Sequence, residues 1–291
     1  MRRAFLVGIN SYNQSPLRGC VNDVALLERE LRGYHIRKCL NSEATKSNIL
    51  TGIEWLTTSS KGDDSCLFSF SGHGAQIIDV HDDEVDGYDE VLCPFDVFDG
   101  NYITDDELSA YLNEVNRETT FEVILDCCHS GTGDRGDINL GTDGKIIKDV
   151  SGRFMDIANV FQEKLNVGKK LIKDKAKSPN NRITLWSACR DYETAADALF
   201  ENYNGAFTFN LIRCLKSCQR LSRYSLIKCL EKNMRVYGFT QIPQMYCSNY
   251  DRFLPFAMNK SEARSLGIKL DVPIKKIIGT TIRHYLDKYD F

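Results

Sequence analysis

Long apolar runs are missing from this chain of 291 residues, in which no stretch approaches the roughly 18 consecutive apolar residues of a membrane-spanning helix. The N-terminal segment MRRAFLVGINSYN has two arginines and a short apolar run that ends at Gly8, without a small-residue cleavage site after it. We therefore expect neither a membrane partner nor a secretion signal, and interpret this run as a first buried strand. Hydrophobic residues make up 42% and charged residues 26%, which indicates an ordinary globular core.

The cysteines also lack a recognisable framework. No C-x-x-C pair occurs, which argues against a structural zinc site. Their number, 11, is odd and they are scattered through a long chain, whereas disulfide frameworks favour short secreted chains with even counts. We therefore expect reduced thiols and a cytoplasmic protein, and we expect no organic cofactor.

Basic residues are absent from one long stretch, since no Lys or Arg occurs between Gly62 and Asn116. Asp and Glu crowd the part from Asp79 to Glu107, whereas the stretch from Lys145 to Arg182 is rich in lysine. An acidic cluster beside a cleft would attract basic substrates, and the alternative is a solvated acidic surface. The net charge of -3 argues against nucleic acid as a partner.

Short apolar runs alternate with helical patterns along the chain. Strands are predicted at 4–9, 34–39, 66–70, 121–125, 183–187 and 244–247, and helices at 21–31, 45–56, 104–115, 206–216 and 224–236. Thr45 or Ser47 can cap the second helix, and Thr104 with Glu107 forms a capping box for the third. This alternation predicts an α/β fold with a mostly parallel central sheet and helices on both faces.

Two polar segments follow directly on predicted strands. The strand 66–70 runs into Ser71-Gly72-His73-Gly74, and 121–125 runs into Asp126-Cys-Cys-His-Ser-Gly. Ligand sites in such sheets lie at the carboxyl ends of strands, so both segments belong at one edge. A thiol nucleophile needs a proton carrier and a means of stabilising an oxyanion, which makes His73 and Cys128 candidates for a catalytic pair. The flanking glycines allow a sharp turn and a close backbone approach to a ligand.

These segments carry a family resemblance. SGHGAQ (71–76) resembles the histidine motif of metacaspases, and DCCHSG (126–131) resembles their cysteine motif; the spacing from His73 to Cys128 agrees with that of caspases. Further matching pieces, in the same order, are RGCVND (18–23), DGYDEVLCPFD (86–96), ITDDEL (103–108), SACRDYETAAD (187–197) and GAFTFNL (205–211). The chain is thereby identified as a member of the metacaspase group of cysteine peptidases, with a caspase-like (caspase-hemoglobinase) fold.

The resemblance implies roles for individual residues. Cys128 would attack the scissile carbonyl as a thiolate, and His73 would hold the proton and pass it to the leaving amine. The backbone N–H groups of Gly74 and Cys128 would form the oxyanion hole. The residues that would line the pocket for the side chain before the cut bond are Cys20, Asp23, Ser71 and Asp126. Carboxylates there fit Arg or Lys, and no arginine stands beside His73 to accept an Asp side chain.

The same resemblance implies stimulation by calcium, an ion that takes six to eight oxygen ligands. The matching acids are Asp89, Asp105, Asp106 and Asp134. An EF-hand at 82–93 is rejected, because Cys93 stands where the twelfth-position Glu is needed. Relatives of this kind tend to be monomers, so we expect a monomer that binds protein or peptide substrates with exposed Arg or Lys.

The expected organisation is one peptidase domain over residues 1–257. It would comprise a large-subunit-like part (1–133), a Lys-rich insertion or mobile loop (134–181) and a small-subunit-like part (182–257), with 258–291 as an extension of unknown role. Because the insertion is basic and expected to be exposed, the enzyme could cut itself there, and the candidate sites are Lys145, Lys148, Arg153 and Lys169.

Other interpretations stay open. A catalytically silent adaptor could keep the same fold, and a caspase-fold protease of another branch could be activated by proteolysis or by a partner in a stress or defence pathway. For Asp23 and Asp126 the alternative to substrate binding is helix capping or bonding to the backbone. Cys127 is expected to be a packed thiol and His129 a structural residue.

Overall fold

The computed structural model describes most of the chain. The described residues are 1–78, 88–127, 136–139, 146–155, 182–190, 193, 195–217, 221–248, 251–258 and 260–267. Cys128, Asp134, Lys145 and Lys169 lie outside them, as does the C-terminal part after 267.

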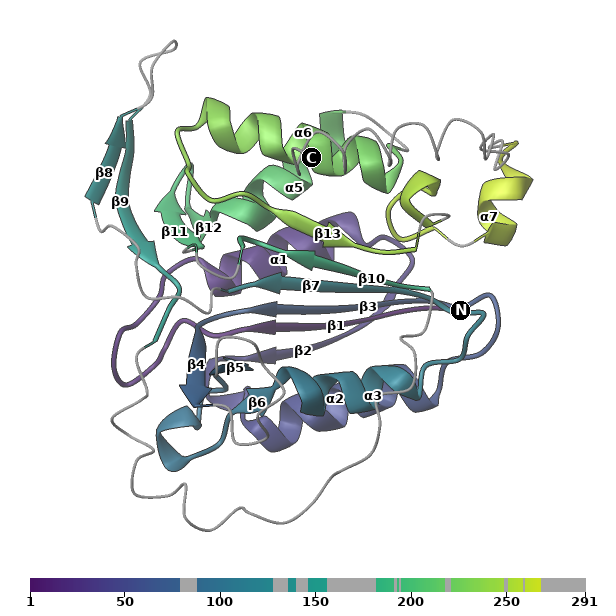
Figure 1. The fold of residues 1–291 in the computed structure, drawn as a ribbon, viewed down its shortest axis with the longest axis horizontal. Helices are drawn as coiled ribbons and strands as arrows, with labels where there is room; N and C mark the ends of the chain where they lie inside the picture. The colour runs from purple at the N-terminus through teal and green to yellow at the C-terminus, as the bar shows by residue number, and fades with distance from the viewer. Residues whose placement is uncertain are drawn as a thin grey trace, which may run out of the picture.

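A central sheet of six strands runs through the middle of the molecule (Figure 1). Its spatial order is β13-β10-β7-β3-β1-β2, with β1 at Arg2–Gly8, β2 at His35–Leu40, β3 at Ser65–Ser71, β7 at Thr120–Asp126, β10 at Ile183–Ser187 and β13 at Gln244–Tyr246. Five strands are parallel and β13 pairs antiparallel with β10. The predicted mostly parallel sheet is confirmed, and each predicted strand is present with its ends shifted by two residues or fewer.

Helices cover both faces of this sheet (Figure 1). One face carries α1 (Cys20–Glu30), α5 (Ala206–Ser217) and α6 (Arg223–Val236), and the other carries α2 (Lys46–Thr58) and α3 (Asp105–Asn113). The short α7 (Lys260–Ser265) follows near the N-terminal ends of the strands. Thr45 accepts a hydrogen bond from Asn48 N–H, and Thr104 accepts one from Glu107 N–H, so both helices have the predicted N-cap. The Glu107 carboxylate of the predicted capping box pairs with Lys46.

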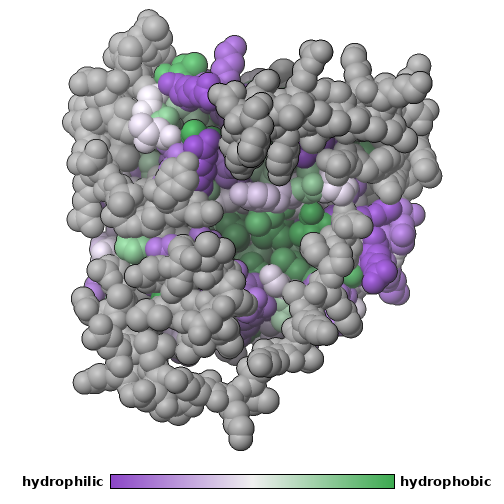
Figure 2. Space-filling view, in the orientation of Figure 1, coloured by the Kyte–Doolittle hydropathy of each residue, from purple (hydrophilic) through white to green (hydrophobic). Residues whose placement is uncertain are grey.

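The core is split in two by the sheet, as the alternation of side chains along a strand requires. On β1, Phe5 and Val7 pack on the α2/α3 side, whereas Ala4 and Leu6 pack on the α1/α5/α6 side. The inner strands β1, β3 and β7 are buried on both faces, whereas the edge strand β2 is largely exposed. Figure 2 shows apolar side chains gathered over the middle of this sheet.

Two smaller antiparallel sheets stand at the carboxyl edge of the central one (Figure 1). The first contains β4 (Gly74–Ile78), β5 (Tyr88–Leu92) and β6 (Ile103–Thr104); the second contains β8 (Gly136–Asn139), β9 (Ile146–Gly152), β11 (Ala196–Leu199) and β12 (Tyr203–Gly205). The expectation of an insertion or mobile loop at 134–181 therefore does not describe β8 and β9, which form regular strands. β8 pairs with β9, and β9 pairs in turn with β11, a long-range contact that local sequence pattern does not report.

One further expectation is corrected on the face that carries α5 and α6. The structure pairs Cys214 of α5 with Cys229 of α6 as a disulfide, so the prediction that all thiols are reduced is wrong for this pair. The two helices pack side by side and bring the two Cα atoms to 6.1 Å, within disulfide range.

Among the described residues, no helix is long and apolar enough to cross a membrane.

Candidate active site

The register of the central sheet brings the two polar segments together. Ser71, the last residue of β3, lies opposite Asp126, the last residue of β7, and Gly72 N–H points at the Asp126 carbonyl oxygen at 3.5 Å. Both segments therefore lie at one edge of the sheet, as predicted from the strand ends. The described part of the second segment ends at Cys127, a thiol that is 1% exposed and so is packed as expected.

His73 is held in one orientation by its neighbours. Its Nε2 lies 2.6 Å from the carbonyl oxygen of Ser15, and its backbone N–H donates to the Tyr12 hydroxyl at 3.1 Å. The Tyr12 ring packs on the imidazole with centroids 4.7 Å apart, and the Tyr12 hydroxyl donates to the Cys93 carbonyl. Since the Ser15 carbonyl can only accept, Nε2 carries the proton and Nδ1 is left as the basic nitrogen of a neutral ring.

The surroundings keep this ring neutral. Burial lowers the pKa of His73 from its ordinary value to about 4, although the backbone carbonyls of Ser15 and Arg153 oppose the shift. Nδ1 is buried and has no hydrogen-bond partner among the residues that the structure describes. A neutral imidazole with a free Nδ1 can accept a proton, which is what general-base chemistry requires.

The glycine before this histidine lies at a bend of the chain and packs against Tyr12. The bend needs no positive φ at Gly72 or Gly74. A Cβ atom at Gly72 would lie 2.6 Å from the Tyr12 hydroxyl, so only glycine leaves room for the side chain that orients the imidazole.

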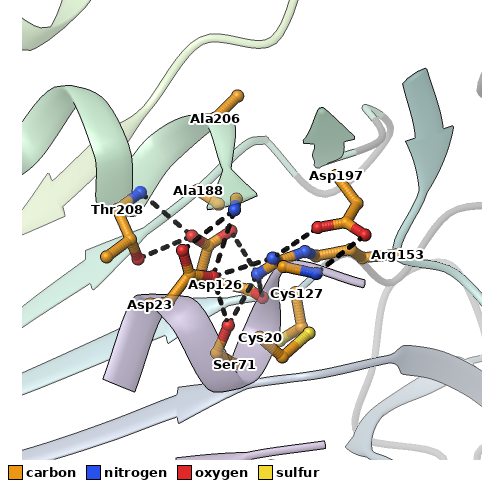
Figure 3. Close-up of polar contacts among 12 residues, drawn as sticks. Cys20, Asp23, Ser71, Asp126, Cys127, Arg153, Ala188, Asp197, Ala206 and Thr208 are labelled. Atoms are coloured by element: carbon orange, nitrogen blue, oxygen red, sulfur yellow. Dashed lines mark hydrogen bonds and ion pairs between the residues drawn. The ribbon is translucent and has the colours of Figure 1, made fainter. Parts of the chain in front are cut away.

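An arginine side chain lies in the predicted acidic pocket (Figure 3). The guanidinium of Arg153 donates from Nη2 to Asp23 at 2.8 Å and to Asp197 at 2.9 Å. Its Nη1 donates to the Ser71 hydroxyl at 2.7 Å and to the Asp126 carbonyl oxygen at 3.0 Å, and lies 3.2 Å from the Asp126 carboxylate. The arginine is completely buried, so the pocket encloses the whole side chain.

The pocket carboxylates are themselves fixed by the backbone. Asp23 accepts hydrogen bonds from Gly205 N–H at 3.0 Å and from the Asn204 amide at 3.0 Å. Asp126 accepts from the N–H and the hydroxyl of Thr208, at 3.0 and 2.6 Å, in the first turn of α5. The expected backbone bonding is therefore present at both carboxylates, and each also contacts the guanidinium of Arg153.

Asp197 is a third pocket carboxylate that the sequence reasoning did not assign. Its Oδ1 contacts Arg153, while its Oδ2 accepts from the N–H groups of Arg18 at 2.8 Å and Gly19 at 3.2 Å. A Cβ atom at Gly19 would lie 2.1 Å from Asp197, so glycine permits the close approach. The available signal was the acid at the end of SACRDYETAAD, but only the fold places it opposite RGCVND.

Three carboxylates around one guanidinium give the pocket a surplus of negative charge. Burial raises the pKa of Asp23 to about 6, while the charge of Arg153 opposes the rise. Burial works against the charge of Arg153 too, but the surrounding acids outweigh it and raise the pKa of Arg153 well above its ordinary value. Cys20 lines the pocket as a neutral thiol, since burial raises its pKa.

The backbone around Arg153 is also held, on both sides. Strand β9 leads into it and pairs antiparallel with β11, where Gly152 lies opposite Ala196. Arg153 N–H donates to the Ala195 carbonyl at 3.0 Å, and the Arg153 carbonyl accepts from Gly74 N–H at 3.0 Å. The segment at Arg153 is therefore held with its side chain in a pocket and its carbonyl on a backbone N–H.

The candidate self-cleavage sites and calcium ligands that the structure describes lie on regular elements or next to them. Lys148 lies on β9, whereas Arg153 was expected on an exposed loop and is fully buried, because its charge is met inside the pocket. Asp89 lies on β5, and Asp105 and Asp106 form the first turn of α3. Within the described ranges, no group of three or more His, Cys, Asp or Glu side chains could hold a metal ion.

Known proteins share this architecture. A family model described as metacaspase, peptidase C14 domain, matches residues 2–134. Metacaspase-1A of Aspergillus oryzae is 30% identical over 285 residues, which cover 85% of this chain and 68% of the relative. The chain belongs to the metacaspase family. Metacaspase-1B of Neurospora crassa is likewise 30% identical over 294 residues, covering 88% of this chain and 69% of that one.

A solved structure agrees with this placement at the level of the fold. The crystal structure of protein GSU0716 from Geobacter sulfurreducens aligns with a TM-score of 0.70 at 24% identity, over 89% of this chain and 98% of that one. Membership of the metacaspase family makes the chain a caspase-like cysteine peptidase, so its substrates are proteins or peptides. The fold expected from the sequence motifs is confirmed.

Proposed function

We propose that this metacaspase is an endopeptidase that cuts after Arg or Lys, with Cys128 as nucleophile and His73 as proton carrier. The proposal depends on the position of Arg153. Its guanidinium is enclosed by Asp23, Asp126 and Asp197, and its backbone carbonyl accepts a hydrogen bond from Gly74 N–H. A positive side chain is the occupant that a pocket with three carboxylates favours.

The chemistry follows from this geometry in two halves. His73 Nδ1 takes the thiol proton of Cys128, and the thiolate attacks the carbonyl carbon of the bound Arg or Lys. The oxyanion that forms lies on Gly74 N–H, which already donates to the Arg153 carbonyl. Collapse breaks the C–N bond, and His73 passes the proton to the leaving amine. Water, deprotonated by His73, then hydrolyses the thioester and releases the carboxylate.

The bound arginine belongs to the chain itself, which supports self-processing after Arg153. As long as Arg153 fills the pocket, a substrate arginine has to displace it, so the uncut chain is a self-inhibited precursor. Purified wild type should yield a fragment that begins at Phe154, identified by mass spectrometry and N-terminal sequencing. Cys128→Ala should stay intact. Equal fragments from both proteins would contradict self-processing and point to a contaminating protease.

The specificity has its own test, which also addresses the silent adaptor. Fluorogenic peptides ending in Arg, Lys or Asp are incubated with the chain at equal concentration. Release from Arg and Lys but not from Asp is the expected result. A folded protein that releases nothing from any peptide, and does not process itself, is an adaptor. Release after Asp would overturn the acidic-pocket assignment.

Calcium stimulation and a monomeric state are further parts of the proposal. The antiparallel register of β5 and β6 pairs Val91 with Thr104, which sets Asp89 and the first turn of α3 at the same end of the small sheet. These described acids do not complete a metal cluster by themselves, so the ligand set needs oxygen atoms beyond them. A calcium titration of peptide cleavage, with Asp89→Asn as control, tests the stimulation, and light scattering tests the monomer.

A further inference from the structure

The chain on the far side of Arg153 is held as firmly as the arginine. Phe154 pairs with Gly74 in a parallel bridge, and Met155 N–H donates to the Gly74 carbonyl at 2.9 Å. Gly74 therefore binds the residue before the Arg153–Phe154 bond through its N–H and the second residue after that bond through its C=O. The chain is thus hydrogen-bonded to Gly74 on both sides of the Arg153–Phe154 peptide bond. A site that recognised the arginine alone would not need the second contact.

The two side chains after the bond enter apolar surroundings on opposite sides of the chain. Met155 is 3% exposed and belongs to the core cluster on the α2/α3 side of the sheet, which also contains Ala75, Ile77 and Cys127. Phe154 is half-buried and packs against the cluster on the α1/α5/α6 side, which contains Ala188 and Ala195. Such alternation is what an extended strand produces.

We propose that this site selects bulky apolar residues at both positions after the cut, so that its substrates are peptides of the form Arg followed by two apolar side chains. The inference rests on the proposed function, because it reads residues 153–155 as a bound substrate. The two pockets differ in solvent exposure. Met155 is almost completely buried, so its pocket should exclude charged side chains, whereas Phe154 is only half-buried and its pocket should select less strongly. Burying a charged side chain without a partner is unfavourable, which gives the selection its direction.

The test uses internally quenched peptides that differ only after the arginine. The reference is Val-Ser-Gly-Arg-Phe-Met-Asp, residues 150–156 of the chain. Variants carry Asp at the first position after Arg, Asp at the second, or Gln in place of Arg. The value of kcat/KM should fall roughly tenfold for Asp at the first position and by more for Asp at the second, since that side chain is the one to be buried. Equal values for all peptides that contain Arg would overturn the inference and leave the proposed specificity intact.

A binding measurement separates the two proposals when chemistry fails. The full chain with Cys128→Ala and Arg153→Gln cannot cut, and its pocket no longer holds its own arginine. Fluorescence anisotropy then gives the Kd of each peptide. Weaker binding of both Asp variants, with or without a preference for Arg, supports the apolar positions. Tight binding that depends on Arg but ignores the residues after it contradicts them.

Discussion

Arg153 and Arg223 are both buried, at opposite ends of the same strand β7, and the difference between their surroundings is instructive. Arg223 meets one carboxylate, donating from Nε to Glu122 at 2.8 Å, and its Nη1 donates to the Asp251 carbonyl. Glu122 is completed by the Trp186 indole N–H at 2.7 Å. Arg153 meets three carboxylates. The charges at Arg223 are balanced by one carboxylate, whereas the carboxylates around Arg153 outnumber its single positive charge.

The two regions also differ in where their arginines come from. Arg223 lies at the start of α6, inside regular structure that packs on the sheet, and its partner Glu122 also accepts from Ala257 N–H. Arg153 follows β9, which lies between β11 and β8 in the smaller four-stranded sheet. The first arginine is part of the helix layer, whereas the proposed function requires the second to give way to a substrate arginine.

Breaking the closed pair should give the largest effect. Glu122→Ala leaves Arg223 buried without a carboxylate, so the free energy of unfolding should fall by about 3–5 kcal/mol. Chemical denaturation measures this loss. Glu28→Ala is the matched control, because its pair with Lys38 at 2.9 Å lies on the surface and contributes about 1 kcal/mol at most. A comparable small loss in both variants would show that the Glu122 pair is not a structural anchor.

The next largest effect should be the pH dependence of stability that arises from Asp23 in the acidic pocket. The pKa of Asp23 in the folded protein, about 6, lies above its ordinary value of 3.8. The stabilising contribution of its protonated form is thus complete below about 3.8 and is lost as pH rises through about 6, by up to about 3 kcal/mol. The Tm of wild type relative to Asp23→Asn should fall between pH 4 and 7.

Activity should move the other way over the same range. The ionised form of Asp23 is the one that pairs with arginine, so kcat/KM for Arg peptides should rise with pH through about 6. Glu54→Gln, at an exposed carboxylate, should change neither curve. Parallel curves for stability and activity would mean that another group controls the pocket.

Removing one of the three pocket charges should reduce specificity without removing the fold. Asp197→Asn keeps an oxygen that can accept from Arg18 and Gly19 N–H but loses its charge toward the guanidinium. A hydrogen bond to a charged group contributes about 1.5–3 kcal/mol, so kcat/KM for Arg peptides should fall roughly tenfold to hundredfold. Steady-state kinetics and the Tm decide together, since a large drop in Tm would reveal a structural role instead.

Asp126 is less suitable for this experiment, because it has a second contact that could not be predicted from the sequence. The strand ends and the Thr104 cap were predicted from local pattern, because strands and caps leave short-range signals, whereas Asp126 and Asp23 were assigned from the family resemblance. The double duty of Asp126, which also accepts from Thr208 N–H at the start of α5, depends on a contact between residues 82 positions apart. Asp126→Ala therefore weakens α5 as well as the pocket.

The arginine in the pocket escaped prediction for a related reason. Lysine-rich composition predicted an exposed loop, and Arg153 was singled out only as a cleavable residue. Its burial arises because β9 pairs with β11 and delivers it to three acids that come from α1, β7 and β11. Each of these contacts joins distant parts of the chain, and composition carries no information about such pairing.

The smallest expected effect comes from the same conservative exchange made in both regions. Arg153→Lys keeps a positive charge but cannot reach Asp23, Asp197 and Ser71 in the planar, forked way that the guanidinium does. Self-cleavage after residue 153 should slow by roughly tenfold, with the Tm changed little because lysine keeps the positive charge among the three carboxylates. Arg223→Lys should do the reverse: it lowers the Tm, since Glu122 loses its two-pronged partner, and leaves the cleavage rate unchanged. Rates from gel densitometry and melting curves for both variants test the contrast, and it fails if the two exchanges affect the same quantity.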